Sequence, residues 1–157
     1  MTEMIEFPTK AADYDTALIY ARLGPRSDQR KITLSDAYFL THLVFYSTRF
    51  GKRPSALSNE NVTWTARALS AISVSAKIQS NLDLLAECEA SRVLLEPSMP
   101  SNPFRKHLTE TVNALGFLPS NASMVGSINR LSQDEIFRDS YHSTLAFILM
   151  ASAINRL

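Results

Sequence analysis

The chain has few of the residues that usually mark a covalent constraint or a reactive site. Of its 157 residues, one is cysteine, three are histidine and four are glycine. The single cysteine, Cys88, forms no internal disulfide, which favours a reduced intracellular protein. The scattered glycines form no phosphate-binding loop, because such loops need several glycines at close spacing. A disulfide-stapled fold and a glycine-rich nucleotide site are therefore excluded.

The chain also lacks an excess of charge and a long apolar run. Its formal net charge is +1, so no overall positive field attracts nucleic acid or a membrane surface. The longest apolar stretch, residues 145–151, is too short to span a bilayer. Residues 1–6 are acidic and not followed by an apolar core, so they do not form a secretory signal. These absences predict a soluble cytoplasmic protein that binds no membrane.

What the sequence does contain is apolar residues at helical spacing. Hydrophobic residues make up 45% of the chain and charged residues 20%, as in globular proteins. The length suits one domain with its own core, over residues 1–157. The spacing, together with caps and breakers, predicts helices over 10–23, 36–50, 58–69, 73–91, 121–131 and 132–157. We therefore expect a mainly α fold in a single domain.

Two of these helices carry the clearest signals. Residues 36–50, capped by Ser35, are apolar nearly all round, which predicts a place in the centre of the core or in a subunit interface. The last helix opens on Ser132 and Glu135, the pair of a capping box. Its residues 144–154 are apolar on every side, more than one intramolecular face can bury. With 10–50 and 121–157 as helical core and dimerisation elements, we predict a homodimer with these interface residues: Leu145, Phe147, Ile148, Leu149 and Ile154.

The segment 92–110 has two interpretations. Three prolines interrupt it: Pro97, Pro100 and Pro103. Residues 92–96 and 106–111 fit the two strands of a small β-hairpin. Residues 104–115, closed by Gly116, fit a helix that follows a loop equally well.

Roughly residues 36–157 resemble the winged helix-turn-helix regulators of the MarR type, with the winged helix-turn-helix itself over residues 58–113. The matching residues are Ala66-Arg-Ala-Leu69 before a bend at 70–73, then Ile78, Leu82 and Leu85, Arg92-Val-Leu-Leu, Arg105-Lys106 and Leu108-Thr-Glu. The resemblance implies a dimeric transcriptional regulator with a recognition helix in the DNA major groove and a β-hairpin wing. It implies DNA contacts from eight residues: Ala76, Lys77, Gln79, Ser80, Arg105, Lys106, Lys52 and Arg53.

The charge of this region favours a second class of function. With the apolar residues of the proposed recognition helix inward, Asp83 and Glu87 point to solvent. Carboxylates outnumber cations over residues 58–97, and a DNA backbone repels carboxylates. The alternative is a small helical interaction protein: an adaptor, anti-activator or inhibitor that binds another protein. A hairpin at 92–110 favours double-stranded DNA as the partner, whereas a loop and helix favour a protein partner.

The polar residues predict no catalytic site. Glu135, Asp139 and His142 lie on one face of the last helix and form half of a bundle-type metal site, but no second helix supplies the other half. We interpret them as a solvated polar face. His42 lies among aromatic residues as a core histidine, and Cys88 has no neighbouring cation that activates its thiol. We therefore predict no enzyme, no metal and no cofactor.

Overall fold

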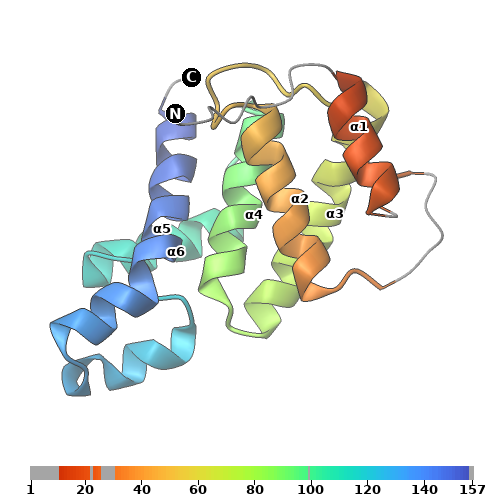
Figure 1. The fold of residues 1–157 in the computed structure, drawn as a ribbon. Coiled ribbons are helices and arrows are strands. Elements are labelled where there is room, and N and C mark those ends of the chain that lie inside the picture. Colours follow the sequence, from red (N-terminus) through yellow and green to blue (C-terminus); the bar gives the residue numbers. More distant parts are fainter. Residues whose placement is uncertain (1–10, 22, 26–30, 99, 156–157) are drawn as a thin grey trace, which may run out of the picture.

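A set of helices surrounds one central helix in the computed structural model (Figure 1). The structure describes residues 11–155 apart from 22, 26–30 and 99, so residues 10 and 22 of the first predicted helix lie outside it. The elements are α1 (Ala11–Tyr20), α2 (Leu34–Ser47), α3 (Asn59–Ile78), α4 (Leu82–Leu95), α5 (Pro103–Leu115), the 3-10 helix η1 (Ala122–Arg130) and α6 (Gln133–Ile154). No β-strand occurs among the described residues. The predicted mainly α fold is confirmed.

The central helix is α4. It contacts α2, α3, α5 and α6, most extensively α6 and α3. Side chains on every side of α4 are buried, including the carboxylates of Glu87 and Glu89. The sequence instead predicted the second helix at the centre of the core or in a subunit interface. In the structure α2 covers one side of α4 (Figure 1) and buries Phe45, while Tyr46 and the nearby Phe50 remain partly exposed.

The bend predicted within the third helix is absent, and α3 is continuous. Ser70 donates a hydrogen bond to the carbonyl oxygen of Ala66, one turn earlier, at 3.0 Å. Ser73 donates to the buried carboxylate of Glu89 at 3.1 Å. Both hydroxyl groups therefore find partners without leaving the helix, so neither serine terminates it. The chain turns later, where Ser80 adopts a left-handed conformation with φ of 59°.

The segment 92–110 contains the end of α4, a loop and the start of α5, so the wing expected of a winged helix is replaced by a helix. Pro103 occupies the first turn of α5, where its missing N–H removes no hydrogen bond. The side chain of Asn102 caps this turn by accepting two backbone N–H groups, each at 3.0 Å. Gly116 ends the helix with φ of 81°, as expected for a left-handed cap. The interpretation as a loop and a helix is confirmed.

Cap residues define the ends of the other helices. The capping box of α6 is confirmed: Ser132 Oγ accepts the N–H of Glu135 at 3.3 Å, and the Glu135 carboxylate accepts the N–H of Ser132 at 2.8 Å. The cap of α2 is Thr33 with Asp36 rather than Ser35, so this helix begins two residues earlier than predicted. None of the described helices combines the length and the hydropathy that a membrane crossing needs.

Candidate functional site

Helix α6 carries an apolar face directed away from the core, which we call the α6 stripe. Its four side chains are exposed by 69%, 48%, 59% and 54%, in the order Phe137, Tyr141, Leu145 and Ile148. At about 100° per residue, these positions lie within about 80° of one another around the helix. The buried side chains of α6 lie on the opposite side of the helix: Ser140, Ser143, Ala146 and Met150. The described part of the chain thus covers one side of α6 and leaves an apolar side in solvent.

The predicted dimer residues divide into exposed and half-buried ones. Three of them are exposed: Leu145, Ile148 and Ile154. Phe147 and Leu149 are half-buried and pack against the chain's own core. The sequence analysis did not single out Phe137 and Tyr141, whose rings stack with centroids 5.7 Å apart. In the sequence, Phe137, Tyr141 and Leu145 recur every four residues, and this spacing was the available signal for an apolar helix face.

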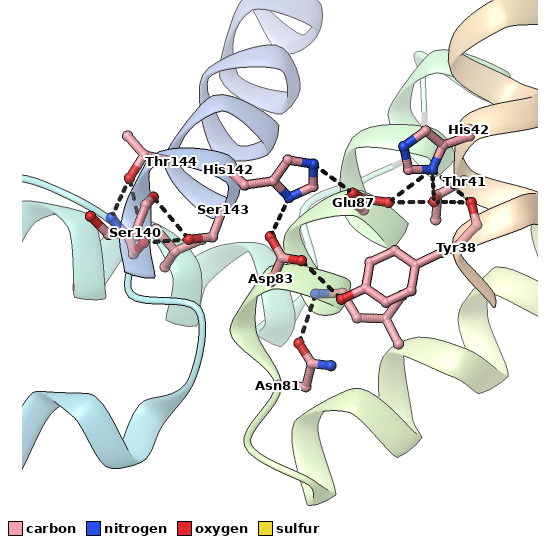
Figure 2. A network of polar contacts seen from close by, with 12 residues as sticks. Tyr38, Thr41, His42, Asn81, Asp83, Glu87, Ser140, His142, Ser143 and Thr144 are labelled. Atoms are coloured by element: carbon pink, nitrogen blue, oxygen red, sulfur yellow. Dashed lines mark hydrogen bonds and ion pairs between the residues drawn. The ribbon is translucent and has the colours of Figure 1, made fainter. Parts of the chain in front are cut away.

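A polar network lies where α4 contacts α2 and α6 (Figure 2). Asp83 and Glu87, one turn apart on α4, carry its two carboxylates. His142 of α6 spans both, with Nδ1 2.8 Å from Asp83 Oδ1 and Nε2 3.5 Å from Glu87 Oε1. From α2, Tyr38 donates to Asp83 Oδ2 at 2.9 Å, and the hydroxyl group of Thr41 donates to Glu87 Oε2. Residues from three helices therefore converge on two carboxylates.

His42 completes the network from the α2 side. Its Nδ1 lies 2.7 Å from the carbonyl oxygen of Tyr38 and 3.7 Å from Glu87 Oε2. The two imidazole rings thus lie on opposite sides of the Glu87 carboxylate (Figure 2). His42, Glu87 and His142 each offer an atom that can bind a metal, and these atoms all lie within 4.8 Å of one another.

The backbone, and not only the side chains, holds α4 against α6 at this point. The N–H groups of the first two residues of α4 donate to the carbonyl oxygen of Ser120, at 2.9 and 3.1 Å. Ser120 in turn donates its own N–H to the carbonyl oxygen of Asp139 on α6, at 3.0 Å. The approach of Asp83 to His142 is therefore set by main-chain contacts that do not depend on the charge of either side chain.

Burial and pairing shift the titration of this network. Burial raises the pKa of the Glu87 carboxyl group above its ordinary value, although the Thr41 hydroxyl group and both imidazoles oppose the rise. The hydrogen bond to Asp83 raises the pKa of His142, against the opposing effect of burial. A buried carboxylate is stable only with a proton or a positive charge beside it. The charge of the Glu87 carboxyl group therefore depends on whether a proton or a positive charge lies between it and the two histidines.

The second buried carboxylate of α4, Glu89, is fully satisfied by its neighbours. Its Oε1 accepts hydrogen bonds from Ser73 at 3.1 Å and Arg92 at 2.7 Å. Its Oε2 accepts one from Asn102 at 2.7 Å and lies 3.5 Å from Nε of Arg105. Glu89 thus links α3, α4 and the start of α5, and its donors leave no position for a further ligand.

The four DNA-contact residues predicted on the recognition helix lie instead at the end of α3 and in the turn that follows it. Ala76 is buried, and Arg105 is buried in its ion pair with Glu89. The other six are at least partly exposed: Lys77, Gln79, Ser80, Lys106, Lys52 and Arg53. Lys77 lies in the last turn of α3 rather than near the start of a helix, because the predicted bend does not exist.

The structure also rearranges the predicted polar groups. Of the three residues on the last helix, only His142 joins the network; Glu135 caps its own helix, and Asp139 pairs with a neighbouring arginine at 3.7 Å. The assignment of Asp83 and Glu87 to solvent was wrong, because α2 and α6 cover the side of α4 opposite its buried leucines. Their spacing of four residues was a signal, but the partners of Asp83 lie 45 and 59 positions away in the sequence.

Comparison with known proteins places the chain in a family. No curated protein and no solved structure matches it. The sequence model of the DUF6895 family, described as a domain of unknown function, matches residues 1–152. The match covers nearly the whole length, including every helix that supplies the α6 stripe and the polar network. The chain therefore belongs to the DUF6895 family.

Proposed function

We propose that the protein is a small helical interaction protein, without catalytic activity, that forms a homodimer through the α6 stripe. The observation that carries the proposal is that α6 is apolar on the side opposite its buried face. Monomeric proteins seldom expose a continuous row of large apolar side chains, and such rows mark association surfaces. Aromatic residues such as Phe137 and Tyr141 are enriched among the residues that dominate binding energy.

The order of residues in the stripe favours an antiparallel arrangement of two copies. Phe137 and Tyr141 form the aromatic half, and Leu145 and Ile148 form the aliphatic half. A two-fold axis near the middle of the stripe places the rings of one copy on the aliphatic side chains of the other. Such an interface is isologous, so it closes with two subunits and covers the stripe of both copies.

The shape of the segment 92–110 supports a protein partner over DNA. A winged-helix regulator uses a β-hairpin at this place, whereas here a loop leads into α5. Arg105, the cation expected at the tip of that hairpin, is buried against Glu89 and is not available to a phosphate. The charge balance of residues 58–97, in which carboxylates prevail, points the same way.

The test measures mass in solution by sedimentation at micromolar concentration. We expect the wild type to sediment at twice the chain mass of 17.5 kDa. The double variant Leu145→Glu/Ile148→Glu buries charge in the proposed interface and should sediment as a monomer with an unchanged circular dichroism spectrum. The matched control is Ile78→Glu, at an exposed apolar residue of α3, which should remain dimeric. A wild type at the monomer mass contradicts the dimer.

A second measurement separates the two classes of partner. Random duplex DNA is titrated with the wild type at about 50 mM salt, where phosphate contacts are strong. We expect no binding. Binding that weakens steeply as salt increases, and that Lys77→Glu reduces, would favour the DNA-binding regulator instead.

A further inference from the structure

The strongest feature outside the proposed interface is the pair of imidazoles around Glu87. His42 of α2 and His142 of α6 lie on either side of this carboxylate of α4 (Figure 2). One ligand atom from each of the three residues falls within a 4.8 Å span. Two histidines and one carboxylate are a frequent ligand set for zinc and for other divalent first-row metals.

The separation of the ligand atoms fits a single ion. Two atoms bound at about 2.0–2.2 Å to one tetrahedral zinc ion are separated by about 3.3–3.6 Å. His142 Nε2 and Glu87 Oε1 are 3.5 Å apart, too far for a good hydrogen bond but suitable for two ligands of one ion. The third ligand, His42, needs only a side-chain adjustment, since its ligand atom lies within 4.8 Å of the other two and its ring is half-exposed.

Glu87 provides the independent observation that points to a ligand. Its side chain is 1% exposed, yet no described group donates a hydrogen bond to Oε1. The other oxygen, Oε2, receives the hydroxyl group of Thr41. A buried acceptor without a donor destabilises the fold, and more so when it is charged. An ion between Oε1 and His142 removes this destabilisation.

The surrounding hydrogen bonds orient both imidazoles as metal ligands. Since carboxylate and carbonyl oxygens accept hydrogen bonds, Nδ1 of each histidine carries the proton: His142 donates to Asp83 at 2.8 Å, and His42 donates to the carbonyl oxygen of Tyr38 at 2.7 Å. The lone pair of Nε2 is then free on each ring. A carboxylate behind a histidine is the usual outer partner in metal sites, and here the Tyr38 hydroxyl group orients that carboxylate in turn.

The charge and the openness of the site also suit a divalent ion. Asp83 and Glu87 pair only with histidines among the described residues, so no lysine or arginine neutralises them. The His42 and His142 side chains are 41% and 49% exposed, so both imidazole rings can be reached from solvent even though the Glu87 carboxylate is buried. Three protein ligands with water in the fourth position is the composition of an open zinc site, whereas magnesium and calcium prefer oxygen ligands.

We propose that the protein binds one zinc ion through His42, Glu87 and His142, with Asp83 as the outer partner of His142. The ion joins α2, α4 and α6, the three helices that meet at the network. The site adjoins the α6 stripe, since the rings of His142 and Tyr141 meet edge to face with centroids 6.2 Å apart, but the zinc proposal uses no residue of the stripe and is tested separately from dimer formation.

The test is a zinc titration of untagged protein that has first been treated with chelator. We expect the wild type to bind one equivalent of zinc, to melt at a higher temperature when zinc is present, and to show no such response to magnesium. His142→Ala should weaken zinc binding by more than about 100-fold, and Asp83→Asn by about 10–100-fold, the usual effect of losing an outer partner. The matched control, His107→Ala, removes the histidine of α5 and should bind like the wild type.

Imidazole NMR signals of the wild type provide a second measurement that needs no variant to fold. The chain has three histidines, and zinc should shift the ring signals of His42 and His142 but not those of His107. The proposal is overturned if the wild type binds no stoichiometric zinc. It is equally overturned if His142→Ala, folded by circular dichroism, binds zinc as well as the wild type, or if the signals of His107 shift instead.

Discussion

At the scale of single residues, the two buried carboxylates of α4 behave differently because their partners differ. Glu89 accepts hydrogen bonds from Arg92, a serine and an asparagine and forms an ion pair with Arg105, so its charge is matched. Removing one member of a buried ion pair leaves the other charge uncompensated and costs about 3–5 kcal/mol. We therefore expect Glu89→Gln to lower the free energy of unfolding by about this amount, measured by urea denaturation.

The control for Glu89 is an exposed pair in the same protein. Lys106 and Glu110 lie one turn apart on α5, at 3.8 Å, with both side chains mostly in solvent. Exposed pairs contribute little, because water and salt already screen each charge. Glu110→Gln should therefore leave the urea midpoint nearly unchanged. Equal losses in the two glutamine variants would mean that the network around Glu89 does not stabilise the fold.

At the scale of helices, two serine residues at N-cap positions should contribute different amounts to the free energy of unfolding. Ser132 begins α6, and its Oγ accepts the N–H of Glu135 in a reciprocal capping box. Ser58 occupies the same position before α3 but makes no side-chain cap hydrogen bond. We expect Ser132→Ala to lower the free energy of unfolding by about 1 kcal/mol, the usual cost of losing a cap. Ser58→Ala should have a much smaller effect in the same denaturation experiment, and the reverse order would contradict these cap assignments.

At the scale of the whole molecule, stability should be greatest at α4 and least at η1. Four other helices contact α4, and most of its side chains are buried. By contrast, Met124 is the one buried residue of η1. Amide hydrogens exchange either through local opening or through complete unfolding, depending on how enclosed they are. Native-state hydrogen exchange should therefore show the α4 amides opening only with the global free energy of unfolding.

The amides of η1 provide the comparison in the same experiment. They should exchange through a local opening of much smaller free energy, because few buried contacts are lost when η1 opens. An α4 that exchanges as easily as η1 would show that it is not the centre of the cooperative unit.

The sequence by itself determined the helical class and the helix ends that depend on local chemistry. The capping box at Ser132 and the excess of apolar residues on the last helix were readable, because each depends on residues a few positions apart, whereas the helix that ends at Gly116 was one of two equal interpretations. The bend at 70–73 was misread since a serine in a helix and a serine in a turn look alike until their hydrogen-bond partners are known.

Only the tertiary structure decided which polar residues are buried and what they meet. Helical periodicity placed Glu87 in solvent, and no local pattern revealed that α2 and α6 enclose it from both sides. His42 and His142, one hundred positions apart, come together only because α4 packs between their helices. The helical period determines the direction in which each side chain points. Which side chains are buried depends on the neighbouring helices, which the local sequence does not specify.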